Sequence, residues 1–126
     1  MYKIYSTKGI HCIVDAYGVN PKTLDNIDYL RQLGKMAIAR SGAIFVNHIE
    51  KKFTPFGCTL LFLLEESHLS FHTFVESLED KSNTYISIDL YTCGDANPEV
   101  AIDYIVEQLQ PDPERIYRQS IVRGVE

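Results

Sequence analysis

The sequence predicts an α+β fold, a two-layer sandwich in which an antiparallel or mixed sheet carries two helices on one face. Segments that alternate apolar and polar residues in steps of two outnumber the two segments whose apolar residues recur every three to four positions. Their order is strand, helix, three or more strands, helix, strand, which is typical of this class. At 126 residues, we expect one domain spanning 1–126.

The first half of the chain combines strand patterns with one long helical pattern. Asn20 can cap a helix that has Pro21 at its first position, and Gly42 can end it. The last segment of this half is almost continuously apolar, so we expect a central strand that is covered on both faces. The expected elements are a strand at 10–17, a helix at 21–40, and strands at 43–50 and 59–65.

The second half repeats the pattern with one further helix. Asn97 and Pro98 again give the capping signal that opens a helix, and Pro111 follows its end. The expected elements are strands at 68–75 and 85–92, a helix at 98–109 and a last strand at 115–122.

The sheet face opposite the helices must meet solvent, a ligand or a partner subunit. Strict alternation in two strands directs a set of polar side chains to this face. The set comprises His68, Ser70, His72, Ser87, Asp89 and Tyr91.

Charge and composition exclude several classes of partner. The net charge is −5, and no Lys/Arg cluster suits a phosphate backbone, so we expect no nucleic acid partner. The apolar run 59–64 is far shorter than the roughly 20 residues of a membrane span, and the start carries no signal peptide pattern. We expect a cytoplasmic protein, no membrane partner, and reduced thiols at Cys12, Cys58 and Cys93, with the first two buried.

The histidines of the polar face admit three interpretations. They can be hydrogen-bonded surface imidazoles. A shared metal ion is disfavoured, because His68 and His72 lie about 13 Å apart on one strand. A hydrolase triad of Ser67 or Ser70 with His72 and Asp89 lacks the Gly-x-Ser-x-Gly elbow.

Two motifs, ESHLSFHT at 66–73 and YTCG at 91–94, resemble the signature of the prokaryotic S-adenosylmethionine decarboxylase proenzymes. The resemblance implies that the Ser67 hydroxyl attacks the Glu66 carbonyl and that His72 assists removal of the Ser67 α-proton. The zymogen would then cleave itself into a β chain, 1–66, and an α chain, 67–126. Ser67 would become a pyruvoyl group that forms a Schiff base with the substrate, without metal or pyridoxal phosphate.

The resemblance also implies the reaction and the other site residues. S-adenosylmethionine would lose CO2 in polyamine (spermidine) biosynthesis, with Cys93 as proton donor, because a thiol with the ordinary pKa of about 8.5 is mostly protonated at neutral pH. Thr59 would support processing, Phe53 would stack on adenine, and Glu76 would bind the ribose. The resemblance implies a homodimer with four αββα layers.

Spacing and departures from the family pattern leave questions open. Ser67 and His72 are five residues apart and fall on opposite faces of a flat strand, so we expect the backbone to turn near Glu66. The family's Trp-Pro stands here as Phe74-Val75, which keeps a pyruvoyl-dependent arginine or ornithine decarboxylase as the alternative. A catalytically dead regulatory homologue is a third reading, disfavoured because the processing residues are present.

Overall fold

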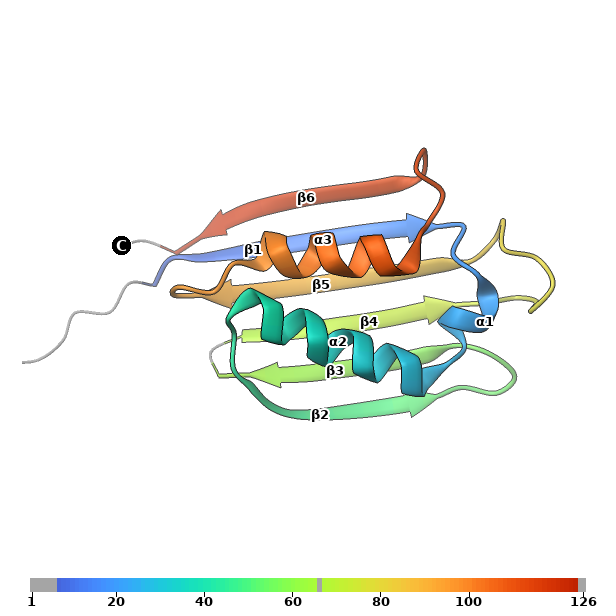
Figure 1. The fold of residues 1–126 in the computed structure, drawn as a ribbon, viewed down its shortest axis with the longest axis horizontal. Coiled ribbons are helices and arrows are strands. Elements are labelled where there is room, and N and C mark those ends of the chain that lie inside the picture. The colour runs from blue at the N-terminus through green and yellow to red at the C-terminus, as the bar shows by residue number, and fades with distance from the viewer. Residues whose placement is uncertain (1–6, 66, 125–126) are drawn as a thin grey trace, which may run out of the picture.

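The computed structural model describes residues 7–65 and 67–124, and its six strands form one sheet (Figure 1). The strand order is β2-β3-β4-β5-β1-β6, and every neighbouring pair is antiparallel. Helices α2 and α3 cover one face, which confirms the predicted two-layer α+β class. The elements are β1 (Gly9–Tyr17), α1 (Pro21–Leu24), α2 (Ile27–Ser41), β2 (Phe45–Lys52), β3 (Cys58–Leu64), β4 (Ser67–Phe74), β5 (Tyr85–Cys93), α3 (Pro98–Leu109) and β6 (Ile116–Arg123).

The single helix expected at 21–40 is wrong, because the chain forms two helices there. Asn20 caps the one-turn helix α1 by accepting a hydrogen bond from the Lys22 amide, as predicted. Asn26 then accepts from the Tyr29 amide at 3.1 Å and caps a new helix, α2. A side chain that bonds to nearby backbone amides offers the chain an alternative to continuing a helix, so the break falls here.

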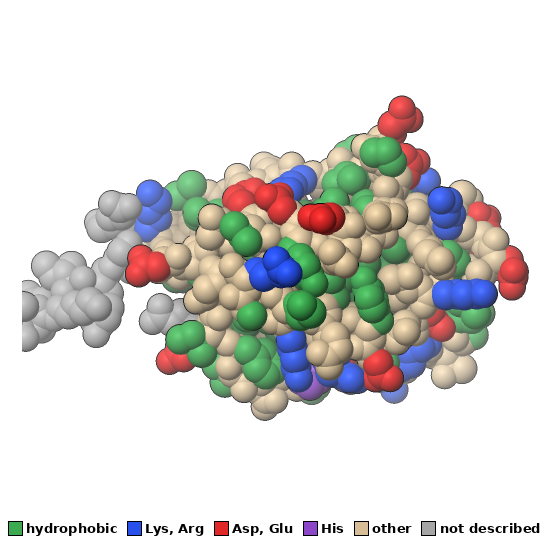
Figure 2. Space-filling view, viewed as in Figure 1, with side chains coloured by type: hydrophobic (Ala, Val, Ile, Leu, Met, Phe, Trp, Pro, Cys, Tyr) green, Lys and Arg blue, Asp and Glu red, His purple; other side chains and the backbone are tan. Residues whose placement is uncertain are grey.

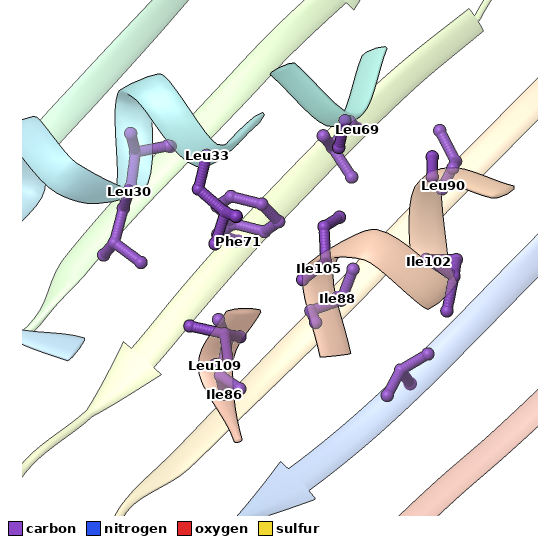
Figure 3. Packing of buried hydrophobic residues seen from close by; sticks show 14 of the residues in the cluster. Leu30, Leu33, Leu69, Phe71, Ile86, Ile88, Leu90, Ile102, Ile105 and Leu109 are labelled. Carbon is purple, nitrogen blue, oxygen red and sulfur yellow. The ribbon is translucent and has the colours of Figure 1, made fainter. Parts of the chain in front are cut away.

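The core lies between the two helices and the sheet (Figure 3). Leu30 and Leu33 of α2 pack onto β4, where Phe71 is fully buried. Gly34 of α2 allows the helix to approach β3, because a Cβ at this position would collide with the Phe62 ring. The labelled core residues of the second helix and of β5 are Ile86, Ile88, Leu90, Ile102, Ile105 and Leu109.

The opposite sheet face, which we call the open face, is uncovered in the single chain. The expectation that β3 is covered on both faces is therefore wrong for one copy. Leu61 is 44% exposed and Leu63 55% exposed, and Ile49 beside them on β2 is 68% exposed. The apolar residues of β3 predicted that both of its faces would be buried, but the helices bury only one of them.

The outer surface of the helical layer faces the viewer in Figure 2. Figure 2 shows basic and acidic side chains interspersed over it, which is ordinary for a solvated surface. Within the described ranges, every helix falls short of the length and apolar character that crossing a bilayer requires.

Candidate active site

Ser67 and Cys93 meet at one end of the sheet. Ser67 is the first residue of β4, Cys93 is the last residue of β5, and both line a pocket with a volume of about 210 Å³. Gly94 continues the pocket wall and holds a positive φ of 73°, which turns the chain away from the sheet toward α3. The structure thus brings the predicted serine and the predicted proton donor together. Glu66, the other residue of the expected cleavage site, lies outside the described residues.

Tyr91 reaches over Gly9 toward the Cys93 thiol. Gly9 pairs with Cys93 across β1 and β5, and a Cβ at Gly9 would lie only 2.7 Å from the Tyr91 ring. A hydrogen bond with the Cys93 side chain raises the pKa of the Tyr91 hydroxyl. The guanidinium of Arg123 stands 5.1 Å from the centre of the same ring. The glycine therefore makes room for the Tyr91 ring and hydroxyl near the thiol.

Thr59 and His72 form a second group at the other end of β4. They are direct partners across β3 and β4, and Thr59 Oγ1 lies 3.1 Å from His72 Nδ1. Both side chains are half-buried. The pair fits the expected role of Thr59 as a hydroxyl that supports the histidine.

Phe53 and Glu76 lie in loops at the same end of the sheet as His72 (Figure 1). Both side chains are exposed, Phe53 to 44%. The loop after β2 is closed by a hydrogen bond from the Phe53 amide to the Gly57 carbonyl, and the Asp25 carboxylate accepts from the Gly57 amide. The expected substrate contacts therefore have no direct access to the Ser67 pocket of their own chain.

Ser67 and His72 do not meet within one chain. From Ser67 onward β4 runs regularly to Phe74, and the turn that we expected near Glu66 falls on a residue outside those that the structure describes. Ser67 pairs with the buried Leu64 on the helix side, whereas His72 faces the open side. Five residues of strand separate their Cα atoms by about 16 Å.

The open face between these groups carries a cluster that the sequence did not reveal. His11 Nε2 lies 2.5 Å and His68 Nε2 lies 3.3 Å from the same Asp89 carboxylate oxygen. Asp89 is thus engaged by two other histidines and does not orient His72, which removes the triad interpretation. Predicting the cluster would have required the strand order β4-β5-β1.

A wider polar groove of about 440 Å³ adjoins this cluster on the open face. His72, Asp89 and Asp15 are among its lining residues. The Tyr85 hydroxyl donates to the Asp15 carboxylate at 2.7 Å, and burial together with this bond raises the pKa of Tyr85 to about 12. Phe74 stacks on the Tyr85 ring with centroids 5.3 Å apart.

Cys12 and Cys58 are fully buried, as expected, and burial raises the pKa of both thiols. Cys93 is partly exposed, and all three cysteines are free. Cys93 is therefore the thiol that a substrate in the end pocket can reach.

The fold and these residues define a class, the two-layer α+β enzymes that present a serine and a thiol in one pocket at the end of a sheet. A family model described as S-adenosylmethionine decarboxylase matches residues 10–124. The chain belongs to this family, which confirms the resemblance read from the two motifs.

Named relatives agree with this assignment over nearly the whole chain. A protein of Bacillus cereus, S-adenosylmethionine decarboxylase proenzyme 2, is 43% identical over 96% of this chain and 93% of its own length. A proenzyme of Pyrococcus abyssi is 36% identical over 95% of this chain and 81% of its own length. The crystal structure of the Aquifex aeolicus adenosylmethionine decarboxylase has a TM-score of 0.81 at 32% identity, covering 97% of this chain and 95% of that one.

Proposed function

We propose that this chain is a self-processing, pyruvoyl-dependent decarboxylase that converts S-adenosylmethionine to its decarboxylated form and CO2 in polyamine biosynthesis. One observation carries the proposal: in a member of this family, Ser67 and Cys93 line a single pocket. The names of the relatives, which combine this decarboxylase with the word proenzyme, support both the reaction and the cleavage.

Processing would begin at Ser67. Its hydroxyl attacks the Glu66 carbonyl, the peptide bond becomes an ester, and elimination splits the chain into 1–66 and 67–126. The sheet order supports survival of the fold after this cut. Strands of the first fragment (β2, β3, β1) interleave with strands of the second (β4, β5, β6), so each fragment is held by ladders to the other.

Cys93 would then serve the decarboxylation. A pyruvoyl group formed from Ser67 would supply the electron sink that loss of CO2 requires. The Cys93 thiol, in the same pocket, delivers a proton to the substrate carbon that loses its carboxylate. The Tyr91 hydroxyl, whose pKa the nearby Cys93 side chain raises, would help to orient the thiol.

A homodimer would complete the site. His72, Thr59, Phe53 and Glu76 belong to the far end of the sheet, and the Ser67 pocket of about 210 Å³ is smaller than the roughly 300–1,000 Å³ of pockets that enclose small molecules. Two copies packed through their open faces, running in opposite directions, would bring the His72 end of one to the Ser67 end of the other.

The exposed apolar residues of the open face support this packing. Ile49, Leu61, Leu63 and Phe74 are each more than 40% exposed, and an apolar face of this kind is stabilised by burial against a partner. Two sheets meeting face to face would give the four layers αββα. Each centre would then draw on both copies.

We also propose a cytoplasmic location and a small-molecule substrate without nucleic acid or membrane partners. The three free thiols and the acidic net charge of −5 support this. An acidic protein attracts a cationic substrate such as S-adenosylmethionine.

The testing experiment measures CO2 release from carboxyl-labelled S-adenosylmethionine, arginine and ornithine, with Ser67→Ala as the inactive control. Release from S-adenosylmethionine alone is expected. Release only from arginine or ornithine would establish the alternative, which the names of the relatives reported above do not favour. An uncleaved chain inactive on all three would establish the regulatory homologue.

A further inference from the structure

Three side chains from three adjacent strands converge on the open face. His11 of β1 and His68 of β4 are both cross-strand partners of Tyr91 on β5, so they flank it on either side. Asp89, two residues before Tyr91, points its carboxylate between the two imidazoles. The candidate donor atoms of His11, His68 and Asp89 all lie within 4.8 Å of one another.

These distances are close to those around a shared metal ion, and without an ion the 2.5 Å contact between His11 and Asp89 is a direct hydrogen bond. Zinc binds imidazole nitrogen and carboxylate oxygen at about 2.0–2.2 Å in tetrahedral geometry, which places neighbouring donor atoms about 3.3 Å apart. His68 Nε2 and Asp89 Oδ1 already lie 3.3 Å apart, and the His11 contact of 2.5 Å needs to open by less than about 1 Å. Two imidazoles and one carboxylate are also a recurring ligand set for divalent transition metals.

The exposure and the rigidity of the three side chains also suit metal binding. In the single chain the His11 side chain is 19% exposed, Asp89 38% and His68 51%, so an ion can reach the cluster before the second copy proposed above covers the open face. The paired strands fix the backbone of all three residues. Three protein ligands leave the fourth position of a tetrahedral ion for water or another ligand.

We propose that His11, His68 and Asp89 form a binding site for one divalent transition-metal ion of the Zn2+ or Co2+ type. The site is separate from the Ser67 and Cys93 pocket, although His68 follows Ser67 in sequence. Metal binding at this site does not depend on cleavage of the chain or on its catalytic activity. Bound metal would tie β4 to β1 across β5.

A second pair of a histidine and a carboxylate supplies a matched control, because its carboxylate already binds an arginine. His48 Nε2 lies 2.9 Å from Glu50, but Arg31 donates to both Glu50 oxygens at 2.7 and 2.6 Å. That carboxylate is already neutralised by a cation. Its histidine should therefore contribute nothing to metal binding.

The test titrates Co2+ and Zn2+ into chelator-treated wild-type protein, followed by visible absorption for Co2+ and calorimetry for Zn2+. One ion per chain is expected, with affinity reduced at least tenfold in His11→Ala, His68→Ala and Asp89→Asn, and unchanged in His48→Ala. Asp89→Asn keeps the side-chain shape, and thermal unfolding checks that each variant is folded. Zn2+ should raise the Tm of wild type and His48→Ala but not of Asp89→Asn.

Cys93 needs its own control, because a thiolate is also a good zinc ligand. Cys93→Ala should bind Co2+ as wild type does. Absence of saturable binding, binding unaffected by the three ligand variants, or binding that disappears in Cys93→Ala would each overturn the proposal.

Discussion

Thr59 Oγ1 and His72 Nδ1 lie 3.1 Å apart across β3 and β4, and this pair stands at the opposite end of β4 from Ser67. A hydroxyl and imidazole so arranged can move a proton, but not one on the Ser67 of the same chain. In the proposed function, each pair therefore serves the serine of a second copy.

Complementation between two inactive variants tests this arrangement. Ser67→Ala and His72→Ala should each remain uncleaved alone. When they are co-expressed with different tags, the heterodimer contains one centre with an intact Ser67 and an intact His72 from different chains. Mass spectrometry of the purified heterodimer should then find the His72→Ala chain cleaved and the Ser67→Ala chain whole.

The opposite results of that experiment are equally informative. A His72→Ala chain that stays whole in the heterodimer would contradict action between copies. Full cleavage of His72→Ala alone would remove the histidine from processing altogether.

Substitution of Cys93 should impair turnover without preventing cleavage of the chain. Cys93→Ala should yield the two fragments but lower kcat by about 10²- to 10⁴-fold, because a positioned proton donor typically contributes that much. Tyr91→Phe, which removes only the hydroxyl near the thiol, should lower kcat less. The measurement is kcat per cleaved chain; a Cys93→Ala enzyme with wild-type kcat would exclude the thiol as donor.

The open face should determine the oligomeric state. Leu61→Asp places a charge on an exposed apolar residue of that face, so the monomer should fold while the dimer is lost. Val100→Asp on the outer side of α3, where Val100 is 41% exposed, is the matched control and should remain dimeric. Light scattering after size exclusion distinguishes these outcomes, and a dimeric Leu61→Asp protein would place the interface elsewhere.

Glu99 should make stability depend on acid pH. Its carboxylate accepts from the Ser120 hydroxyl and pairs with Arg118, each at 2.5 Å, and the Ser120 bond is the main cause of its lowered pKa. A lowered pKa in the folded state contributes stability that is complete above the ordinary value of 4.5 and is lost as the pH falls through the folded value.

Glu99→Gln should accordingly lower the free energy of unfolding by about 1 kcal/mol at pH 7. The value is modest because the side chain is 44% exposed. The difference in free energy of unfolding from wild type should shrink as the pH falls below the ordinary value of 4.5 and through the lowered folded value. Urea unfolding at several pH values measures it. Asp103→Asn, which alters the 67% exposed partner of Arg118, should cost less; a pH-independent difference for Glu99→Gln would contradict this explanation.

Much of the fold was predictable because local signals agree with the final packing. Alternating residues gave the strands to within about two positions, and Asn20 and Asn97 cap helices as expected. The break at Asn26 was missed, because the apolar stripe of α2 continues smoothly through it. The apolar run of β3 led us to expect cover on both faces, which is wrong for one chain, because Leu61 and Leu63 are exposed on the open face.

The sequence predicted site residues only where they belong to one strand or one motif. Ser67 and Cys93 were proposed through the motifs. The odd spacing of Ser67 and His72 led us to expect a turn near Glu66, whereas from Ser67 onward the two residues lie on opposite faces of a regular strand. The distance argument against a metal at His68 considered His72 alone. His11, almost sixty residues away in sequence, becomes the neighbour of His68 only when β1 and β4 pair with β5.

Intact-mass spectrometry of the purified wild-type protein tests the central proposal most directly. The account predicts two fragments, 1–66 and 67–126, with the second lighter than a serine-initiated fragment by the mass of one ammonia and without a free amino terminus. Ser67→Ala should give one uncut chain. A wild-type protein that remains a single 126-residue species, or a second fragment that begins with an ordinary serine, would contradict the account.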